Sequence, residues 1–231
     1  PYGALTGRSA EARRIAAQRL REGMDVAANF GAEIVTTCPL AEGYDYPFQV
    51  DYYGAWDRFV DTLRGVVTHR RDVSLVLEFQ PHEPYAKIML TNVGKMLHLC
   101  SEVDTPNFGA NLDVGHSFAA GESPAESAAL LARKGWLRYV HTNDNPGDGG
   151  DWDMMSGTVH FWQWLELLYT LEQVGYDGWF SADLEPKRFG PIAAFRTNVT
   201  TIKRMTAFLH RIGADRITSS IADERETPRL Y

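Results

Sequence analysis

The chain has 231 residues, 44% of them hydrophobic and 23% charged, with a formal net charge of -7 at pH 7. A chain of this length and composition can bury a sizeable core as one domain, and it is not typical of a disordered protein. The acidic balance and the lack of a basic stripe argue against nucleic acid as a partner. Two cysteines and no apolar run long enough for a bilayer indicate neither a disulfide framework nor a membrane anchor, so the expected location is the cytoplasm.

The hydrophobic pattern predicts strands and helices in alternation along the chain. A helix begins after the N-cap residue Ser9 and ends at Gly31. Strands are expected at residues 33–37, 73–79, 108–114, 137–141 and 179–184. Five further helices are expected. The first contains residues 56–67, the second begins after a cap at Thr91, and the third begins at the capping box of residues 123–126. The fourth covers residues 161–174, and the last runs through Ile202, Met205 and Leu209.

This alternation predicts a βα-repeat fold in a single domain of residues 1–213, with its strands parallel. The polar segment of residues 214–231 is expected to be a C-terminal arm or tail. The predicted strands are too few for a closed barrel, which needs about eight. Two architectures remain open at this point: an open doubly wound sheet, or a barrel whose first units are missing from this chain.

Four residues with metal-binding side chains lie at or just past the ends of predicted strands: Glu78, Asp113, His141 and Asp183. The carboxyl ends of parallel strands share one rim of the fold, so these side chains are expected to converge. Three carboxylates and one imidazole suit a divalent cation. The single histidine favours Mn²⁺, with Mg²⁺ or Co²⁺ as the alternatives. For one isolated carboxylate, a helix cap or an ion pair with Arg188 is the simpler interpretation, but four such positions favour a metal site.

Five motifs, in order and in register, resemble the xylose-isomerase-like TIM-barrel sugar isomerases and epimerases. They are residues 77–84 (LEFQPHEP), 111–116 (NLDVGH), 141–145 (HTNDN), 151–157 (DWDMMSG), and 175–179 (GYDGW) running into 183–188 (DLEPKR). The similarity covers about residues 3–188 and is greatest to the L-rhamnose isomerase-like branch. It implies a (β/α)8 barrel in which Glu78, Asp113, His141 and Asp183 belong to strands five to eight. The first three βα units of the family would then be missing from this chain.

The resemblance also implies roles for particular residues. Glu78, Asp113, His141 and Asp183 would bind one divalent ion, with Glu78 and Asp183 also catalytic. A second ion would lie among Asp113, His116, Asp151 and Asp153, and His116 would also act in catalysis or contact substrate. Further substrate contacts are expected from Gln80, His82, Trp152 and Arg188, and Glu185 is a reserve ligand. His69, His98, His160 and His210 are expected to be structural.

One position departs from the family pattern. Many relatives have Lys two residues after the strand-five Glu, where this chain has Gln80, whose neutral amide cannot supply a charge to an oxyanion. A strict hydride-shift isomerase is less strongly indicated for this reason.

The motifs and the ligand set together lead us to expect a metal-dependent sugar isomerase or epimerase acting on a free monosaccharide. A metal-dependent lyase that cleaves a glycoside or oxidised sugar by β-elimination is the second hypothesis. A non-catalytic barrel subunit is the third. The aromatic loop of residues 44–53 predicts a homo-oligomer or a partner subunit.

Overall fold

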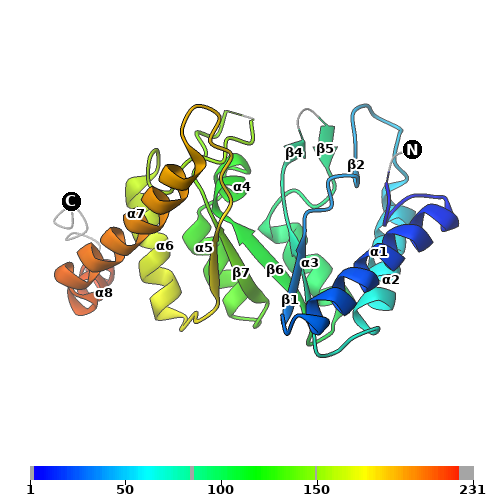
Figure 1. Ribbon diagram of the computed structural model, residues 1–231, viewed down its shortest axis with the longest axis horizontal. Helices are drawn as coiled ribbons and strands as arrows, with labels where there is room; N and C mark the ends of the chain where they lie inside the picture. The colour runs from blue at the N-terminus through cyan, green and yellow to red at the C-terminus, as the bar shows by residue number, and fades with distance from the viewer. Residues whose placement is uncertain (1–2, 84–85, 149, 224–231) are drawn as a thin grey trace.

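The computed structural model describes residues 3–83, 86–148 and 150–223. Its main sheet has the strand order β1-β3-β6-β7-β8, with every neighbouring pair parallel (Figure 1). These strands are β1 (Ile34–Thr37), β3 (Ser74–Glu78), β6 (Phe108–Asp113), β7 (Leu137–Thr142) and β8 (Trp179–Ala182). The predicted strands and their parallel order are confirmed. β8 ends earlier than expected, so Asp183 follows the strand directly.

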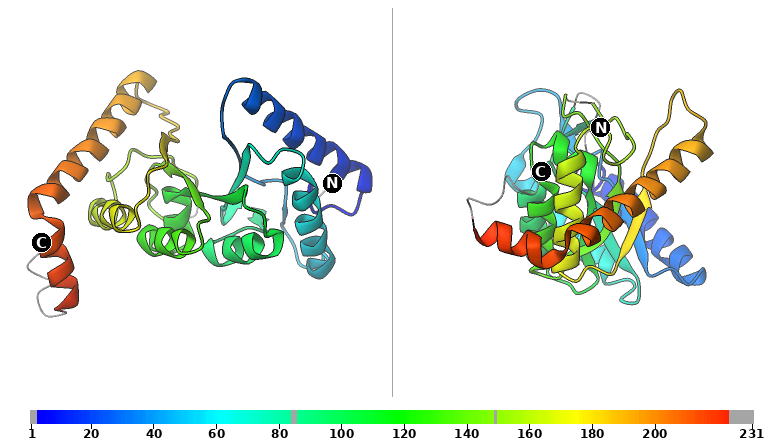
Figure 2. Two further views of the ribbon diagram at one scale, coloured as in Figure 1. Left: turned by 90° about the horizontal axis from the view of Figure 1, so that it is seen from below. Right: turned by 90° about the vertical axis from the view of Figure 1, so that its left-hand side faces the viewer.

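Four of the eight helices in the described part of the chain form a layer on one side of the sheet, which decides between the two architectures (Figure 2). The eight helices are α1 (Ala10–Asn29), α2 (Tyr52–Val67), α3 (Val93–Val103), α4 (Val114–Ala119), α5 (Pro124–Ala132), α6 (Phe161–Gln173), α7 (Pro191–Ile212) and α8 (Ala214–Ala222). A doubly wound sheet reverses its strand order and covers both faces with helices. Here the order never reverses, and α2, α3, α5 and α6 line one side of a curled sheet that is open on the other (Figure 2). The fold is part of a TIM barrel.

A small antiparallel sheet, which the sequence pattern did not predict, lies beside the ends of the parallel strands (Figure 1). It is formed by β2 (Gly43–Tyr44), β5 (Ala86–Ile88) and β4 (His82–Glu83). Strands of two or three residues are too short to show a hydrophobic period. The segment that follows β3 is tied to the segment that follows β5 by a hydrogen bond from the backbone N–H of Gln80 to the Leu90 carbonyl.

Side-chain capping fixes where several helices begin. The predicted caps at Ser9 and Ser123 are confirmed, because their hydroxyls accept from the amides of Ala12 and Glu126. The cap predicted at Thr91 is wrong by one residue. Asn92 has the extended cap conformation, and its side chain accepts from the Lys95 amide at 2.9 Å. Asn is a better N-cap than Thr, so residue type itself favoured Asn92 over Thr91.

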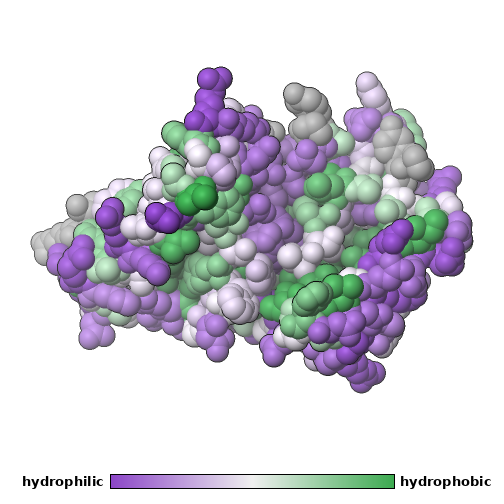
Figure 3. Space-filling model, viewed as in Figure 1, coloured by the Kyte–Doolittle hydropathy of each residue, from purple (hydrophilic) through white to green (hydrophobic). Residues whose placement is uncertain are grey.

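Alternation along the strands separates a core face from a polar face. Leu75, Leu77, Ala110 and Leu112 belong to the apolar core between the sheet and the outer helices. The alternate positions of β3 and β6 face the open side of the curled sheet, and they include Glu78, Asn111 and Asp113. In Figure 3 hydrophilic surface occupies the upper middle of the open face, with apolar patches on both sides.

The two ends of the described chain form α1 and the α7–α8 pair, at opposite ends of the curled sheet (Figure 2). Of the segment expected to be an arm, residues 214–222 form α8, which buries Ile217 and Ser220, and residues 224–231 lie outside the described part. Within residues 3–83, 86–148 and 150–223, no helix is both long enough and apolar enough to cross a membrane.

Candidate metal centre

Glu78, Asp113, His141 and Asp183 come together at the ends of four adjacent strands. One ligand atom from each can be chosen so that all four atoms lie within 4.8 Å of one another. The sheet register explains the convergence, because Asp113 is the direct partner of His141 across the β6–β7 pair. Glu78 ends β3 on the other side of β6, and Asp183 follows β8 on the other side of β7.

The ring of His141 lies at the centre of this group. Its Nδ1 is 3.0 Å from Asp183 Oδ2, 3.2 Å from Glu78 Oε2 and 3.6 Å from Asp113 Oδ2. Despite these short distances, this buried nitrogen forms no hydrogen bond of acceptable geometry in the described chain. This arrangement is expected when the nitrogen and the surrounding carboxylate oxygens all bind one cation. The donor set therefore fits a divalent metal.

The electrostatics of the group also favour a cation. Burial opposes ionisation of Glu78, but His116 and His141 outweigh that effect and lower its pKa to about 2. Burial lowers the basicity of His141, whereas Asp113, Asp183 and Glu78 together raise its pKa to about 12. In the described part of the chain, the ion pairs of these carboxylates are all with histidines. A divalent ion would supply the positive charge that lysine and arginine do not.

Exposure rises across the group from one side to the other. The side chains of Asp113 and Glu78 are 0% and 6% exposed, that of His141 is 13% exposed, and that of Asp183 is 47% exposed. The buried side anchors the ligands, and the Asp183 side is open to solvent. A substrate would therefore approach the centre past Asp183.

His116, on the short helix α4, lies next to the centre. Its Nδ1 is 2.9 Å from Glu78 Oε1, and its Nε2 is 3.1 Å from Asp151 Oδ2. The Asp113 carboxylate caps α4 by accepting from the His116 amide at 2.8 Å, which places the imidazole against the acids. Burial opposes protonation of His116, but Asp113, Asp151 and Glu78 raise its pKa well above the ordinary value.

Asp153 is separated from Asp113 by the amide of Asn143. The Asn143 Nδ2 donates to Asp153 Oδ1 at 3.1 Å and to Asp113 Oδ2 at 2.9 Å. Asp153 has a backbone φ of 44°, a conformation that Asp tolerates better than most residues. Burial and the neighbouring charges of Asp151, Asp183 and Asp113 raise its pKa to about 7. The residues expected to hold a second ion are thus close together, but an amide bridges two of them.

Two asparagines that sequence reasoning did not select organise the acids. Asn111 Nδ2 donates to Glu78 Oε2 at 3.0 Å, and Asn143 contacts Asp113 as described above. The Gly115 amide donates to Asn143 Oδ1 at 2.7 Å, and a Cβ at Gly115 would come within 2.8 Å of that oxygen. Both asparagines are fully buried. Asn111 and Asn143 belong to the NLDVGH and HTNDN motifs, and this is the feature of the sequence that could have identified them.

Gln80 is buried and already occupied by protein groups. Its Nε2 lies 2.9 Å from Glu83 Oε2, 3.2 Å from the His82 carbonyl and 3.4 Å from Asp151 Oδ2. Its Oε1 lies 3.3 Å from the sulfur of Cys38. The amide therefore connects the small sheet to the loop that carries Asp151.

The remaining expected substrate contacts lie farther out. His82 is half-buried in β4, Trp152 is half-exposed, and Arg188 is exposed. Glu185 is exposed, and its carboxylate lies 3.4 Å from the Lys187 ammonium, so the structure places it outside the group of four.

The histidines expected to be structural have protein partners away from the centre. His69 contacts Asp25, His210 contacts Glu172, and the ring of His98 lies edge-on to Trp56. His160 stacks on Phe118 and bonds to the buried Asp144.

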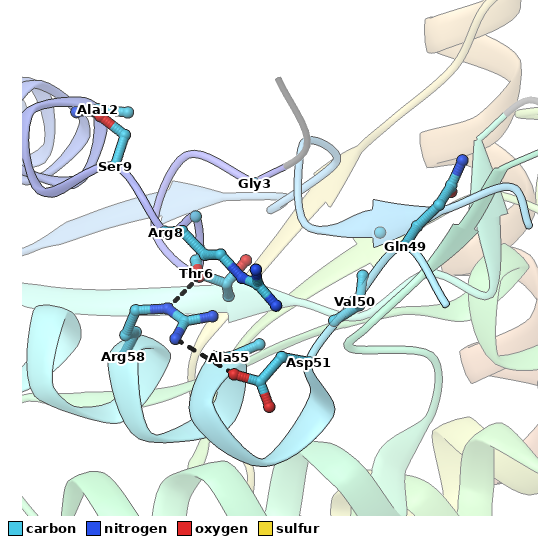
Figure 4. Close-up of a pocket in the computed structure, with 12 residues that line it drawn as sticks. Gly3, Thr6, Arg8, Ser9, Ala12, Gln49, Val50, Asp51, Ala55 and Arg58 are labelled. Atoms are coloured by element: carbon cyan, nitrogen blue, oxygen red, sulfur yellow. Dashed lines mark hydrogen bonds and ion pairs between the residues drawn. The ribbon is translucent and has the colours of Figure 1, made fainter. Parts of the chain in front are cut away.

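A separate hollow of about 260 Å³ lies between the starts of α1 and α2 (Figure 4). The Nε of Arg58 donates to the Thr6 carbonyl at 2.7 Å, and its Nη1 lies 3.7 Å from Asp51 Oδ2. The hollow shares no lining residue with the group of four. Because Asp51 already balances Arg58, we assign this hollow no part in the chemistry.

Comparison with known proteins identifies the family. The sequence matches the family described as xylose isomerase-like TIM barrel over residues 1–218. The chain belongs to this family. This member is 29% identical over 181 residues to a xylose isomerase of Thermus thermophilus, an alignment that covers 76% of the chain and 47% of that relative. The chain thus spans about half the length of the curated relatives it matches.

Solved structures of the xylose isomerase-like family share the fold of this chain. A D-tagatose 3-epimerase-like protein superposes with a TM-score of 0.74 at 22% identity, covering 91% of this chain and 75% of that chain. An L-ribulose 3-epimerase superposes with a TM-score of 0.65 at 16% identity, covering 97% of this chain and 75% of that chain. At these identities the superpositions establish the TIM-barrel architecture alone.

Proposed function

We propose that the protein is a divalent-metal-dependent sugar isomerase or epimerase that acts on a free, unphosphorylated monosaccharide. The observation that supports this proposal is the convergence of Glu78, Asp113, His141 and Asp183 around an unpartnered imidazole nitrogen. Mn²⁺ is the ion that we propose, because the donor set combines three carboxylates with one histidine. A bound ion would hold neighbouring sugar oxygens and polarise the carbonyl.

In this proposal Glu78 and Asp183, at the two ends of the row of four, exchange the proton of the substrate. One of Glu78 and Asp183 removes the proton from the carbon next to the carbonyl, and the other returns a proton to the same carbon or its neighbour. Glu78 is held for this by Asn111 and His116, and Asp183 faces the open side of the centre. His116, linked to Asp151, would hold a substrate hydroxyl. Asp151 and Asp153 would bind a second ion.

Gln80 favours proton transfer over hydride transfer in this proposal. A hydride shift between adjacent carbons benefits from a fixed positive charge near the substrate oxygen, and the amide of Gln80 has none. Its Nε2 is also engaged by Glu83, the His82 carbonyl and Asp151. Epimerisation or isomerisation through an enediolate needs only the two carboxylates and the polarised carbonyl.

The experiment combines metal analysis with a sugar panel in D₂O. The purified protein is analysed for bound metal and is then incubated with free aldoses and ketoses in Mn²⁺, Mg²⁺ or Co²⁺. Proton transfer incorporates solvent deuterium at the reacting carbon, which ¹H NMR detects, whereas a direct hydride shift does not. No metal-dependent conversion of any sugar would contradict the proposal.

Variants identify the residues responsible. We expect Glu78→Gln and Asp183→Asn each to lower kcat by about 10²-fold or more. His98→Asn is the matched control, because His98 contacts Trp56 and lies outside the centre. Full activity in Glu78→Gln would exclude this carboxylate as an acid or base.

A further inference from the structure

A groove of about 350 Å³ lies between the loop at residues 152–158 and the loop at residues 184–189. We call it the Trp152 groove. Its apolar lining comprises Trp152, Met154, Met155, Leu184, Pro186, Phe189 and Ala194. Trp152 is 50% exposed and Phe189 is 66% exposed, so the groove keeps two aromatic side chains in contact with water. Exposed apolar surface gathered in one concavity indicates a binding site.

The Trp152 groove adjoins the metal centre through two residues. Asp153 lines the groove, and its carboxylate accepts from the same Asn143 amide that contacts Asp113. Leu184 lines the groove and directly follows Asp183, the most exposed member of the group of four. The backbone link from the Glu185 amide to the Asp153 carbonyl, at 3.4 Å, holds the two loops together. The groove therefore begins where the centre opens.

The walls of the groove are fixed by polar contacts outside it. The Trp152 indole nitrogen donates to Asp148 Oδ1 at 2.6 Å, which holds the ring in place. The buried Asn198 accepts from the Ser156 amide at 2.7 Å and so anchors the same loop to α7. A preformed aromatic wall loses little conformational entropy when it binds a ligand.

We propose that the Trp152 groove binds an apolar-faced substituent of a sugar held at the metal centre, either an aryl aglycone or the face of a second pyranose ring. The inference rests on the proposed function and extends its substrate class from free monosaccharides to sugars that carry such a ring away from the reacting carbonyl. Seven of the twelve residues that line the groove are apolar. The lining carries two acids, Asp153 and Glu185, against two bases, Lys187 and Arg188, so it has no excess positive charge for a phosphate.

The test compares affinities in the Mg²⁺-loaded protein. Calorimetry measures the dissociation constants of D-glucose, phenyl β-D-glucopyranoside, cellobiose and D-glucose 6-phosphate. In parallel, ¹H–¹⁵N NMR follows the Trp152 indole signal, assigned with Trp152→Phe. We expect the phenyl glucoside or cellobiose to bind about tenfold or more tightly than glucose and to shift that signal. The two glycosides distinguish the aryl ring from the second sugar ring.

Two variants and a control locate the effect. Trp152→Ala and Phe189→Ala are each expected to reduce the glycoside-to-glucose affinity ratio to about one. Phe30→Ala removes an exposed aromatic residue at the end of α1, outside the groove, and should preserve the ratio. A ratio near one in the parent protein, a ratio that survives both variants, or tightest binding of the phosphate would overturn the inference. No shift of the Trp152 signal with either glycoside would overturn it as well.

Failure of the proposed function has a different signature. The His141 ring signals report the metal centre, and they should respond to Mg²⁺ and then to sugar. If they do not respond, the proposed function fails, whatever happens at Trp152. If they respond while the glycosides show no advantage, only the groove assignment fails.

Discussion

Asp113 is completely buried and bonds to the His116 amide and to the Asn143 side chain. Replacing it with Asn preserves its shape but removes a charge and turns an amide donor toward the Asn143 donor. We expect Asp113→Asn to weaken Mn²⁺ binding at least about tenfold, measured by calorimetry. His98→Asn should bind Mn²⁺ as the parent does. Parental affinity in Asp113→Asn would argue against the metal centre.

We expect His141 to make metal binding dependent on pH. Its pKa is raised to about 12 by Asp113, Asp183 and Glu78, so the metal-free protein carries a proton on this ring at neutral pH. A metal that binds the ring must displace that proton, and a higher pH makes the displacement easier. We expect the apparent Mn²⁺ affinity to rise by about tenfold per pH unit between pH 6 and 8 for one proton released.

Calorimetry in buffers with different ionisation enthalpies counts the protons released. The pH titration follows the affinity, and both are repeated with His141→Gln, which lacks a titrating ring. An affinity that does not change with pH in the parent protein would show that His141 is not a ligand.

The sequence predicted the four-residue group because each member lies at the end of a strand and carries an unmistakable ligand side chain. It did not single out Asn111 and Asn143, since an amide is common on any polar surface and its role depends on the register of neighbouring strands. Gln80 was expected to contact substrate, and only the structure shows its bonds to Glu83 and Asp151.

Among the elements, α7 contacts the end of β7 through the buried side chain of Asn198. Asn198 accepts from the Ser156 amide at 2.7 Å and contacts Thr142 Oγ1 through its Nδ2 at 3.1 Å. Asn198→Ala leaves the buried Ser156 amide unpaired and removes the bond to Thr142, and we expect the free energy of unfolding to fall by about 1–3 kcal/mol in urea titrations. Thr197 is the exposed neighbour of Asn198, and Thr197→Ala should change the free energy of unfolding by less than about 0.5 kcal/mol. Equal effects of the two variants would contradict the assigned contact.

The long elements were predictable because their apolar periods are long. The buried stripe of α2 follows a helical period, and the uniformly apolar run of β3 is typical of a central parallel strand. The short helix α4 was missed because it follows β6 without a connecting turn and is too short for a helical period. Its cap, Asp113, is also a candidate ligand, so one residue serves both roles.

At the scale of the whole molecule, we propose that copies of the chain associate through the aromatic loop before and within the start of α2. Tyr46, Phe48 and Tyr53 are 69%, 103% and 84% exposed. Phe48 also has a φ of 69°, a costly conformation for a bulky residue. We expect light scattering to give a dimer or tetramer at micromolar concentration, and Phe48→Ser with Tyr53→Ser to lower the mass. A monomeric parent protein would contradict this.

The architecture was predictable from motifs more than from strand count. Five parallel strands are compatible with several α/β folds, and the motifs at strand ends favoured the barrel. The curvature of the sheet and the single layer of helices could not be derived from periodicity, because both faces of a central parallel strand can appear apolar in sequence.

The four candidate ligands lie at or just past the ends of four neighbouring strands of the main sheet, so no local segment of the chain could bind the ion alone. The cation would cross-link most of the sheet, and its affinity would contribute to global unfolding rather than to the fraying of one loop. Chelation with EDTA should therefore lower the melting temperature of the entire cooperative transition, measured by calorimetry. The protein's resistance to heat would then report how much metal its surroundings supply.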